Sequence, residues 1–256
     1  MYSQNFEKQD ILNNGQINKP PAMTFILGCR CPDGVLLAAD KKVTLIDNWS
    51  VEFDYREKLF VLFRHIIVGS SGSTDNFELF RGSVIDYHNR HPDEITFDNV
   101  VTTLSPIVYK LNKRYNFQYD FAFDTLVATQ PPDRPSSLNF ISLNGLPHEV
   151  IDYCAVGSGK TYAKVFLEKS WDKDMMMEQV AELAYFIIKY IEDFKLNSGV
   201  GVGDHEPQIW FIPNNKRDEE GRKWDGLATK AQLEQFQINA NNRLKKHEAD
   251  LIGLFK

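Results

Sequence analysis

The chain of 256 residues is long enough to bury a sizeable core, and its 43% hydrophobic and 25% charged residues give the balance of an ordinary globular protein. A net charge of −6 argues against broad capture of nucleic acid or anionic lipid, because either partner would need a positive face. No window is long and apolar enough to cross a bilayer, and residues 1–23 lack the apolar stretch of a secretory signal. Three cysteines, Cys29, Cys31 and Cys154, are too few for a disulfide framework. We therefore expect a cytoplasmic protein without nucleic-acid or membrane partners.

In chain order, a strand-rich first third is followed by two helices, a second group of strands, two more helices and a final strand. The first strands form a hairpin over residues 25–31 and 35–40, which is joined by the turn residues Pro32, Asp33 and Gly34. Further strands are predicted over residues 51–63, 65–68, 123–129, 138–143, 149–155 and 208–212. Helical spacing of apolar residues covers 74–88, 96–115, 160–171 and 175–194.

This segregated order favours an α+β fold in which two packed sheets are flanked by helices, rather than an alternating parallel sheet. Cys29 and Cys31 fall two apart on one strand, so they share one face and are expected to pack in the core. We divide the chain into a leading segment at 1–23, a domain at 24–213, and a polar linker with an amphipathic helix at 214–256. That helix either docks on its own domain or serves as a partner-binding extension.

Five short motifs occur together in the domain. They are Thr24 with Gly28, Ala38-Ala39-Asp40, Lys58 before Leu59-Phe60, Gly69-Ser70-Ser71-Gly72, and Gly157-Ser158-Gly159. In their order and spacing the chain resembles proteasome β-type subunits, as a divergent archaeal-like or bacterial-like member. The resemblance implies the four-layer αββα sandwich of the N-terminal nucleophile hydrolases and a threonine endopeptidase. It also implies a homo- or hetero-oligomeric ring of related subunits acting on peptides or unfolded proteins, with no cofactor or metal ion.

The resemblance gives the matched residues catalytic roles. Thr24 would be the nucleophile, and its own α-amine would accept and return the hydroxyl proton near neutral pH. Lys58 would favour the developing alkoxide, and Asp40 would hold that lysine in place. The backbone N–H of Gly69 would receive the oxyanion, while Ser158 would help to hold the amine and a water molecule.

Support of the amine is expected from a second segment. The family's aspartate-serine pair aligns with Asn197 and Ser198, where an amide replaces the carboxylate and cannot hold a negative charge. Asp193 would take that role if the alignment shifts. The glycine-rich segment 199–204 that follows makes the connection into the last strand longer than it is in the family. The extra length would reshape the site.

The positions that match the family's first specificity pocket are Val43, Thr44, Arg56, Ile67 and Ser71. An arginine near the pocket would favour substrates with acidic side chains through charge-assisted hydrogen bonds.

Activity depends on the chain beginning at Thr24, because only a free amine can act as the base. Self-processing members of the family carry glycine just before the threonine, whereas Met23 precedes it here. Residues 1–23 are thus a propeptide, a flexible tail or a mis-assigned start. Two alternatives remain open: a non-catalytic structural ring subunit that retains residues 1–23, and a related peptide ligase or transpeptidase in which an amine captures the acyl-threonine.

Overall fold

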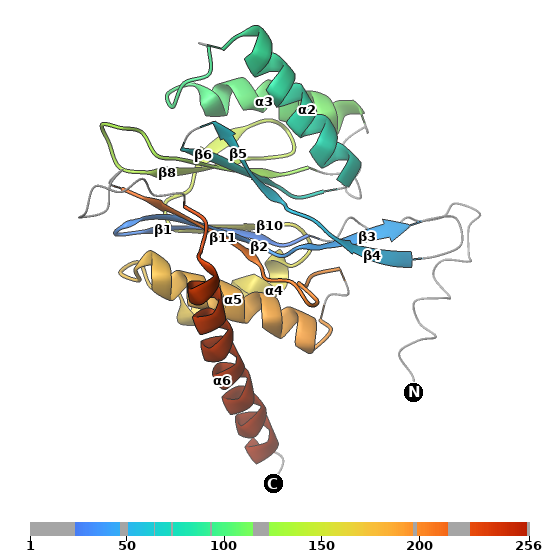
Figure 1. The fold of residues 1–256 in the computed structure, drawn as a ribbon, viewed down its shortest axis with the longest axis vertical. Helices are drawn as coiled ribbons and strands as arrows, with labels where there is room; N and C mark the ends of the chain where they lie inside the picture. The colour runs from blue at the N-terminus through green and yellow to red at the C-terminus, as the bar shows by residue number, and fades with distance from the viewer. Residues whose placement is uncertain are drawn as a thin grey trace.

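The computed structural model describes residues 24–46, 51–63, 65–72, 74–92, 94–114, 123–196, 199–214 and 226–254. Two antiparallel sheets pack face to face, and a helix pair covers the outer face of each sheet (Figure 1). The predicted α+β, four-layer αββα sandwich is therefore confirmed.

The first sheet has the strand order β10-β1-β2-β11. Its strands are β1 (Ile26–Cys31), β2 (Gly34–Ala39), β10 (Tyr153–Val156) and β11 (Gln208–Pro213). β1 and β2 are the predicted hairpin, and every residue of β2 is buried because layers cover both faces of this sheet.

The second sheet has the order β5-β6-β7-β8-β9. Its strands are β5 (Leu59–Phe63), β6 (Ile66–Ser70), β7 (Thr125–Thr129), β8 (Ser137–Ile141) and β9 (Pro147–Glu149). Ile26 and Leu37 of the first sheet meet Leu59, Leu126 and Leu138 of the second in a shared core, which holds the two sheets together.

Helices α2 (Thr74–Arg90) and α3 (Val100–Arg114) lie over the second sheet, where Phe80 and Leu104 pack against Val68. Helices α4 (Lys160–Ser170) and α5 (Met177–Asp193) lie under the first sheet (Figure 1). Cys29 is buried in the core beneath this sheet and the partly buried Cys31 packs against the same core, as their spacing predicts.

The last helix, α6 (Lys230–Leu254), packs across α5 and extends beyond the sandwich (Figure 1). Its apolar side chains Phe236, Ala240 and Leu244 are buried in the core that contains α5. Polar contacts join Asn239 and Arg243 to Glu182 of α5. No helix in the described part of the chain is long and apolar enough to span a membrane.

Two sequence predictions were wrong in detail. The single strand expected over residues 51–63 is two strands, because β4 (Val51–Tyr55) pairs with the unpredicted β3 (Lys42–Ile46) in a separate projecting hairpin, whereas β5 joins the second sheet (Figure 1). The strand expected over residues 149–155 is likewise split. β9 pairs with β8 in the second sheet and β10 with β1 in the first, so the chain crosses between sheets at residues 150–152.

Candidate active site

Asp40 lies at the end of β2, where the hairpin with β1 places it opposite Phe25. The Asp40 amide donates to the carbonyl of Phe25 at 3.1 Å, and the Phe25 amide donates back to Asp40 Oδ1 at 2.8 Å. Thr24, directly before Phe25, is 5% exposed, and Asp40 is fully buried. The carboxylate is therefore fixed to the backbone one residue from the candidate nucleophile.

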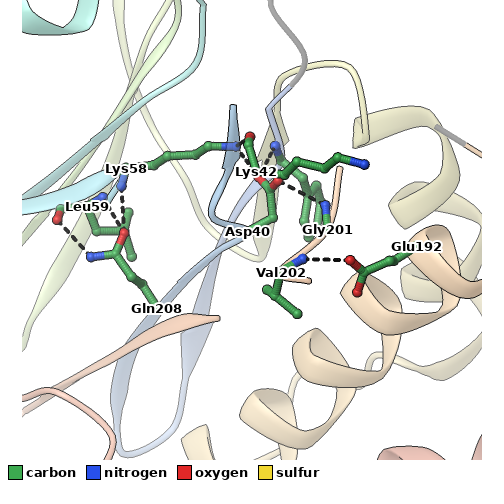
Figure 2. A network of polar contacts seen from close by, with 9 residues as sticks. Asp40, Lys42, Lys58, Leu59, Glu192, Gly201, Val202 and Gln208 are labelled. Carbon is green, nitrogen blue, oxygen red and sulfur yellow. Dashed lines mark hydrogen bonds and ion pairs between the residues drawn. The ribbon is translucent and has the colours of Figure 1, made fainter. Parts of the chain in front are cut away.

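Lys58, directly before β5, reaches the same carboxylate from the other sheet (Figure 2). Its Nζ donates to Asp40 Oδ1 at 2.6 Å and to the carbonyl of Lys42 at 2.6 Å, and the residue is 5% exposed. Gln208 of β11 holds the other end of the residue, since its Oε1 accepts from the amides of Lys58 and Leu59 at 2.6 and 3.0 Å. Both the backbone and the amine of Lys58 are thus held in place.

Burial sets the electrostatics of this pair. It raises the pKa of Asp40, although the bonded Lys58 and the amides of Phe25 and Gly201 oppose the rise. Burial lowers the pKa of Lys58, and Asp40 opposes that change. Because Lys58 is buried, solvent screens its ammonium group weakly, and a cation at Nζ acts strongly on charge that develops nearby.

The loop between β10 and α4 lies against Thr24. The Gly159 amide donates to the Thr24 carbonyl at 3.3 Å. Gly157 has φ +88°, and a Cβ there would lie 2.0 Å from the Thr24 carbonyl oxygen, so only glycine fits. The Oγ of Ser158 is buried and neither accepts nor donates a hydrogen bond within the described ranges. The two residues that flank Ser158 therefore lie against Thr24, and the Ser158 hydroxyl has no hydrogen-bond partner among the described residues.

Gly69 of β6 lies close to the start of β1, which follows Thr24. It pairs in register with Leu59, the residue after Lys58, and a Cβ added to it would lie 3.2 Å from a methyl group of Ile26. Ile26 is two residues after Thr24. The structure thus gathers five of the predicted catalytic residues: Thr24, Asp40, Lys58, Gly69 and Ser158.

Four of the predicted pocket positions have described side chains. Ile67 and Ser71 are buried and lie on the same face of β6 and its continuation as Gly69. Val43 is partly buried on β3. Arg56 is exposed, and its Nε donates to Asp54 Oδ2 at 2.7 Å, so its charge already has a partner.

Of the remaining predicted residues, only Asp193 has a described side chain. Asn197 and Ser198 lie outside the described residues, and so does the side chain of Thr44, whose backbone belongs to β3. Asp193 is exposed at the end of α5, where its carboxylate lies 3.6 Å from Lys189 Nζ.

Sequence reasoning did not identify three residues that hold the site in place. Gln208 holds the backbone of Lys58, the Gly201 amide donates to Asp40 Oδ2 at 3.1 Å, and Glu192 binds the loop that carries Gly201. The glycine-rich run at 199–204 was visible as an unusual connection, but nothing in its sequence indicated that it reaches Asp40. Among the described residues, no group of three His, Cys, Asp or Glu side chains could hold a metal ion.

The comparisons with known protein sequences all match one family. Residues 23–202 match the sequence model of a family described as "Proteasome subunit". "Proteasome subunit beta 1" of Pyrobaculum aerophilum is 24% identical over 184 residues, which cover 70% of this chain and 87% of that protein. "Proteasome subunit alpha" of Methanococcus vannielii is 29% identical over 182 residues, which cover 67% of this chain and 66% of that protein.

A solved structure agrees in fold. Anbu (ancestral beta-subunit) from Yersinia bercovieri superimposes with a TM-score of 0.66 at 18% identity, and the match covers 91% of this chain and 97% of that one.

Proposed function

Since the chain belongs to the proteasome subunit family, we propose that it is a threonine endopeptidase whose nucleophile is Thr24. One observation carries the proposal: Asp40 Oδ1 accepts both from the Phe25 amide and from Lys58 Nζ. A single carboxylate oxygen thereby holds a buried ammonium group beside the first residues of β1. A structural ion pair alone would not need to be centred on the residue after Thr24.

In the proposed reaction the Thr24 hydroxyl oxygen bonds to the carbonyl carbon of a peptide, and its proton passes to the free α-amine of Thr24. The oxyanion of the tetrahedral intermediate is received by the Gly69 amide. The carbon–nitrogen bond then breaks, and the departing amine takes the proton. Water attacks the remaining ester, which releases the acid and restores the threonine hydroxyl.

Lys58 and Ser158 assist this sequence in different ways. The cation of Lys58 lowers the free energy of the alkoxide without taking part in bonding. The Oγ of Ser158, which bonds to none of the described residues, is free to bind the α-amine or the attacking water. We propose that Asn197 and Ser198, which lie outside the described residues, support the amine, the role that the resemblance implies for them.

For specificity, we propose a weak preference for acidic side chains through Arg56, in a pocket formed with Val43, Thr44, Ile67 and Ser71. Arg56 must exchange Asp54 for the substrate, and exposed ion pairs contribute little, so the exchange is feasible but the gain in binding is small. Removing the competitor by Asp54→Asn should raise the ratio of cleavage rates for acidic over apolar fluorogenic peptides. An unchanged ratio contradicts the role of Arg56.

The second candidate is a non-catalytic ring subunit, and the match to an alpha subunit favours it. The two are separated by peptide hydrolysis with the full chain, Thr24→Ala and the exposed Thr102→Ala as a matched control. Endopeptidase activity predicts a loss of at least about a thousandfold for Thr24→Ala and no loss for Thr102→Ala. Equal turnover by Thr24→Ala refutes the nucleophile. A product joined to an added acceptor amine would identify a ligase instead.

A further inference from the structure

We propose that Glu192 is a positioning residue for this site, because it holds the loop at residues 199–203 against Asp40. The inference rests on the proposed function for its kinetic consequence, but its structural consequence can be measured without any activity. Glu192 lies in the last turn of α5, on the opposite side of the loop from Asp40 (Figure 2).

The carboxylate of Glu192 binds the loop directly. Its Oε1 accepts from the amides of Val202 and Gly203 at 3.0 and 2.8 Å. Its Oε2 accepts from Lys189 Nζ at 2.8 Å, one turn earlier on the helix. The lysine fixes the carboxylate and balances its charge, so the two loop amides have a rigid acceptor.

The other side of the loop binds the site. The Gly201 amide donates to Asp40 Oδ2 at 3.1 Å, and the Gly201 carbonyl accepts from the amides of Lys41 and Lys42 at 3.1 and 3.0 Å. The Lys42 carbonyl in turn accepts from Lys58 Nζ at 2.6 Å. Gly201 is therefore bonded to the carboxylate and also to the strand whose carbonyl holds the ammonium group (Figure 2).

Packing explains the glycine at the centre of this arrangement. A Cβ at Gly201 would lie 2.4 Å from Glu192 Oε1, so the carboxylate lies directly against the loop backbone. With Oε2 held by Lys189, the carboxylate cannot turn away without losing its own bonds. Gly201 thus leaves room for the Glu192 carboxylate, which binds the amides of the next two residues.

The consequence for the site follows from the two oxygens of Asp40. Oδ1 accepts from Phe25 and Lys58, whereas Gly201 is the donor to Oδ2 within the described residues. If the loop moves, a buried carboxylate oxygen loses its partner, and the carboxylate is held through Oδ1 alone. The position of Lys58 relative to Thr24 is then less tightly fixed.

The test compares Glu192→Ala with Glu192→Gln in the full chain, and uses Glu178→Ala as a control because Glu178 is exposed at the opposite end of α5. Backbone hydrogen exchange is read at the loop and at Lys41 and Lys42. Covalent inactivation by a peptide epoxyketone, a threonine-directed inhibitor, is followed at several inhibitor concentrations. This gives the inactivation rate constant and the binding constant of the inhibitor separately.

For Glu192→Ala, amide exchange at Lys41 and Lys42 should accelerate while β1 and β2 stay protected. The inactivation rate constant should fall at least about tenfold with an unchanged binding constant. Glu192→Gln keeps an acceptor oxygen and should recover most of both properties, while Glu178→Ala should match the wild type. A role confined to loop stability predicts faster exchange at Val202 and Gly203 alone with normal inactivation, which would overturn the proposal. If the wild type forms no adduct, the proposed function fails, and exchange at Lys41 and Lys42 alone decides whether Glu192 is a positioning residue.

Discussion

Replacing Lys58 by methionine should be strongly destabilising, because it leaves the buried Asp40 carboxylate without its ion-pair partner. Removing one member of a buried pair typically costs about 3–5 kcal/mol in the free energy of unfolding. Asp40 keeps the amides of Phe25 and Gly201 as donors, so we expect a loss near the lower limit, about 3 kcal/mol.

The loss should depend on pH, with a definite sign. Burial already raises the pKa of Asp40, and Lys58 is the main influence that opposes the rise, so the pKa rises further in Lys58→Met. The folded variant then binds a proton that the unfolded chain, with an aspartate pKa of about 3.9, does not bind. The stability that this protonation of Asp40 contributes is therefore present at low pH and is lost as pH rises through the folded pKa. The difference from the wild type should be largest at pH 8 and smaller at pH 5.

The assay is urea unfolding followed by circular dichroism at both pH values. Arg56→Met is the matched control, since its ion pair with Asp54 has a similar length, 2.7 Å against 2.6 Å, but is exposed. It should cost much less than Lys58→Met, because exposed ion pairs contribute little to stability. The double variant Asp40→Asn/Lys58→Met should lose the pH dependence. A cost for Lys58→Met as small as that of Arg56→Met, at both pH values, refutes this description of the pair.

Three further predictions concern the surroundings of the site, two of them on variants and one on the reactivity of a thiol. Gly157→Ala should lower the unfolding free energy by at least about 2 kcal/mol and abolish inhibitor labelling of Thr24, because the methyl group meets the Thr24 carbonyl at a positive φ; normal labelling would contradict this contact. Gln208→Leu should cost about 2–3 kcal/mol in urea unfolding, since it leaves two buried amides of the Lys58 segment without an acceptor, and a cost below about 0.5 kcal/mol would count against that role. Burial raises the pKa of Cys154 to about 11, so at pH 8 its alkylation by iodoacetamide should be about 100-fold slower than that of a free thiol and should accelerate with rising pH; a rate like that of a free thiol would disprove the shift.

Much of the fold could be predicted because local patterns and layer packing agree. The β1–β2 hairpin has a turn sequence that fits its geometry, and α5 carries an apolar stripe that its packing uses. The errors arose where a continuous β-rich sequence crosses between sheets, as at residues 150–152. Side-chain periodicity does not report which sheet a strand joins, so such crossings have no local signal.

The site was predictable to the extent that it uses recognisable motifs. Asp40 and Lys58 were assigned from a resemblance, and the structure brings them within 2.6 Å. Gln208 and Gly201 bind the site, and Glu192 binds the loop that carries Gly201; each of these hydrogen bonds has a backbone amide on one side, which places no demand on a sequence motif. The two contacts with the site also join residues that are distant in sequence: Gln208 lies 150 residues from Lys58 and Gly201 lies 161 residues from Asp40, and only the assembled sandwich brings them together.

The intact mass of the purified protein, before and after incubation with a peptide epoxyketone, decides whether Thr24 is an N-terminal nucleophile. We expect a chain that begins at Thr24 and gains the mass of one inhibitor, with no gain in Thr24→Ala. A chain that begins at Met1 and gains no mass would contradict it, because an amide nitrogen in place of the α-amine cannot act as the base.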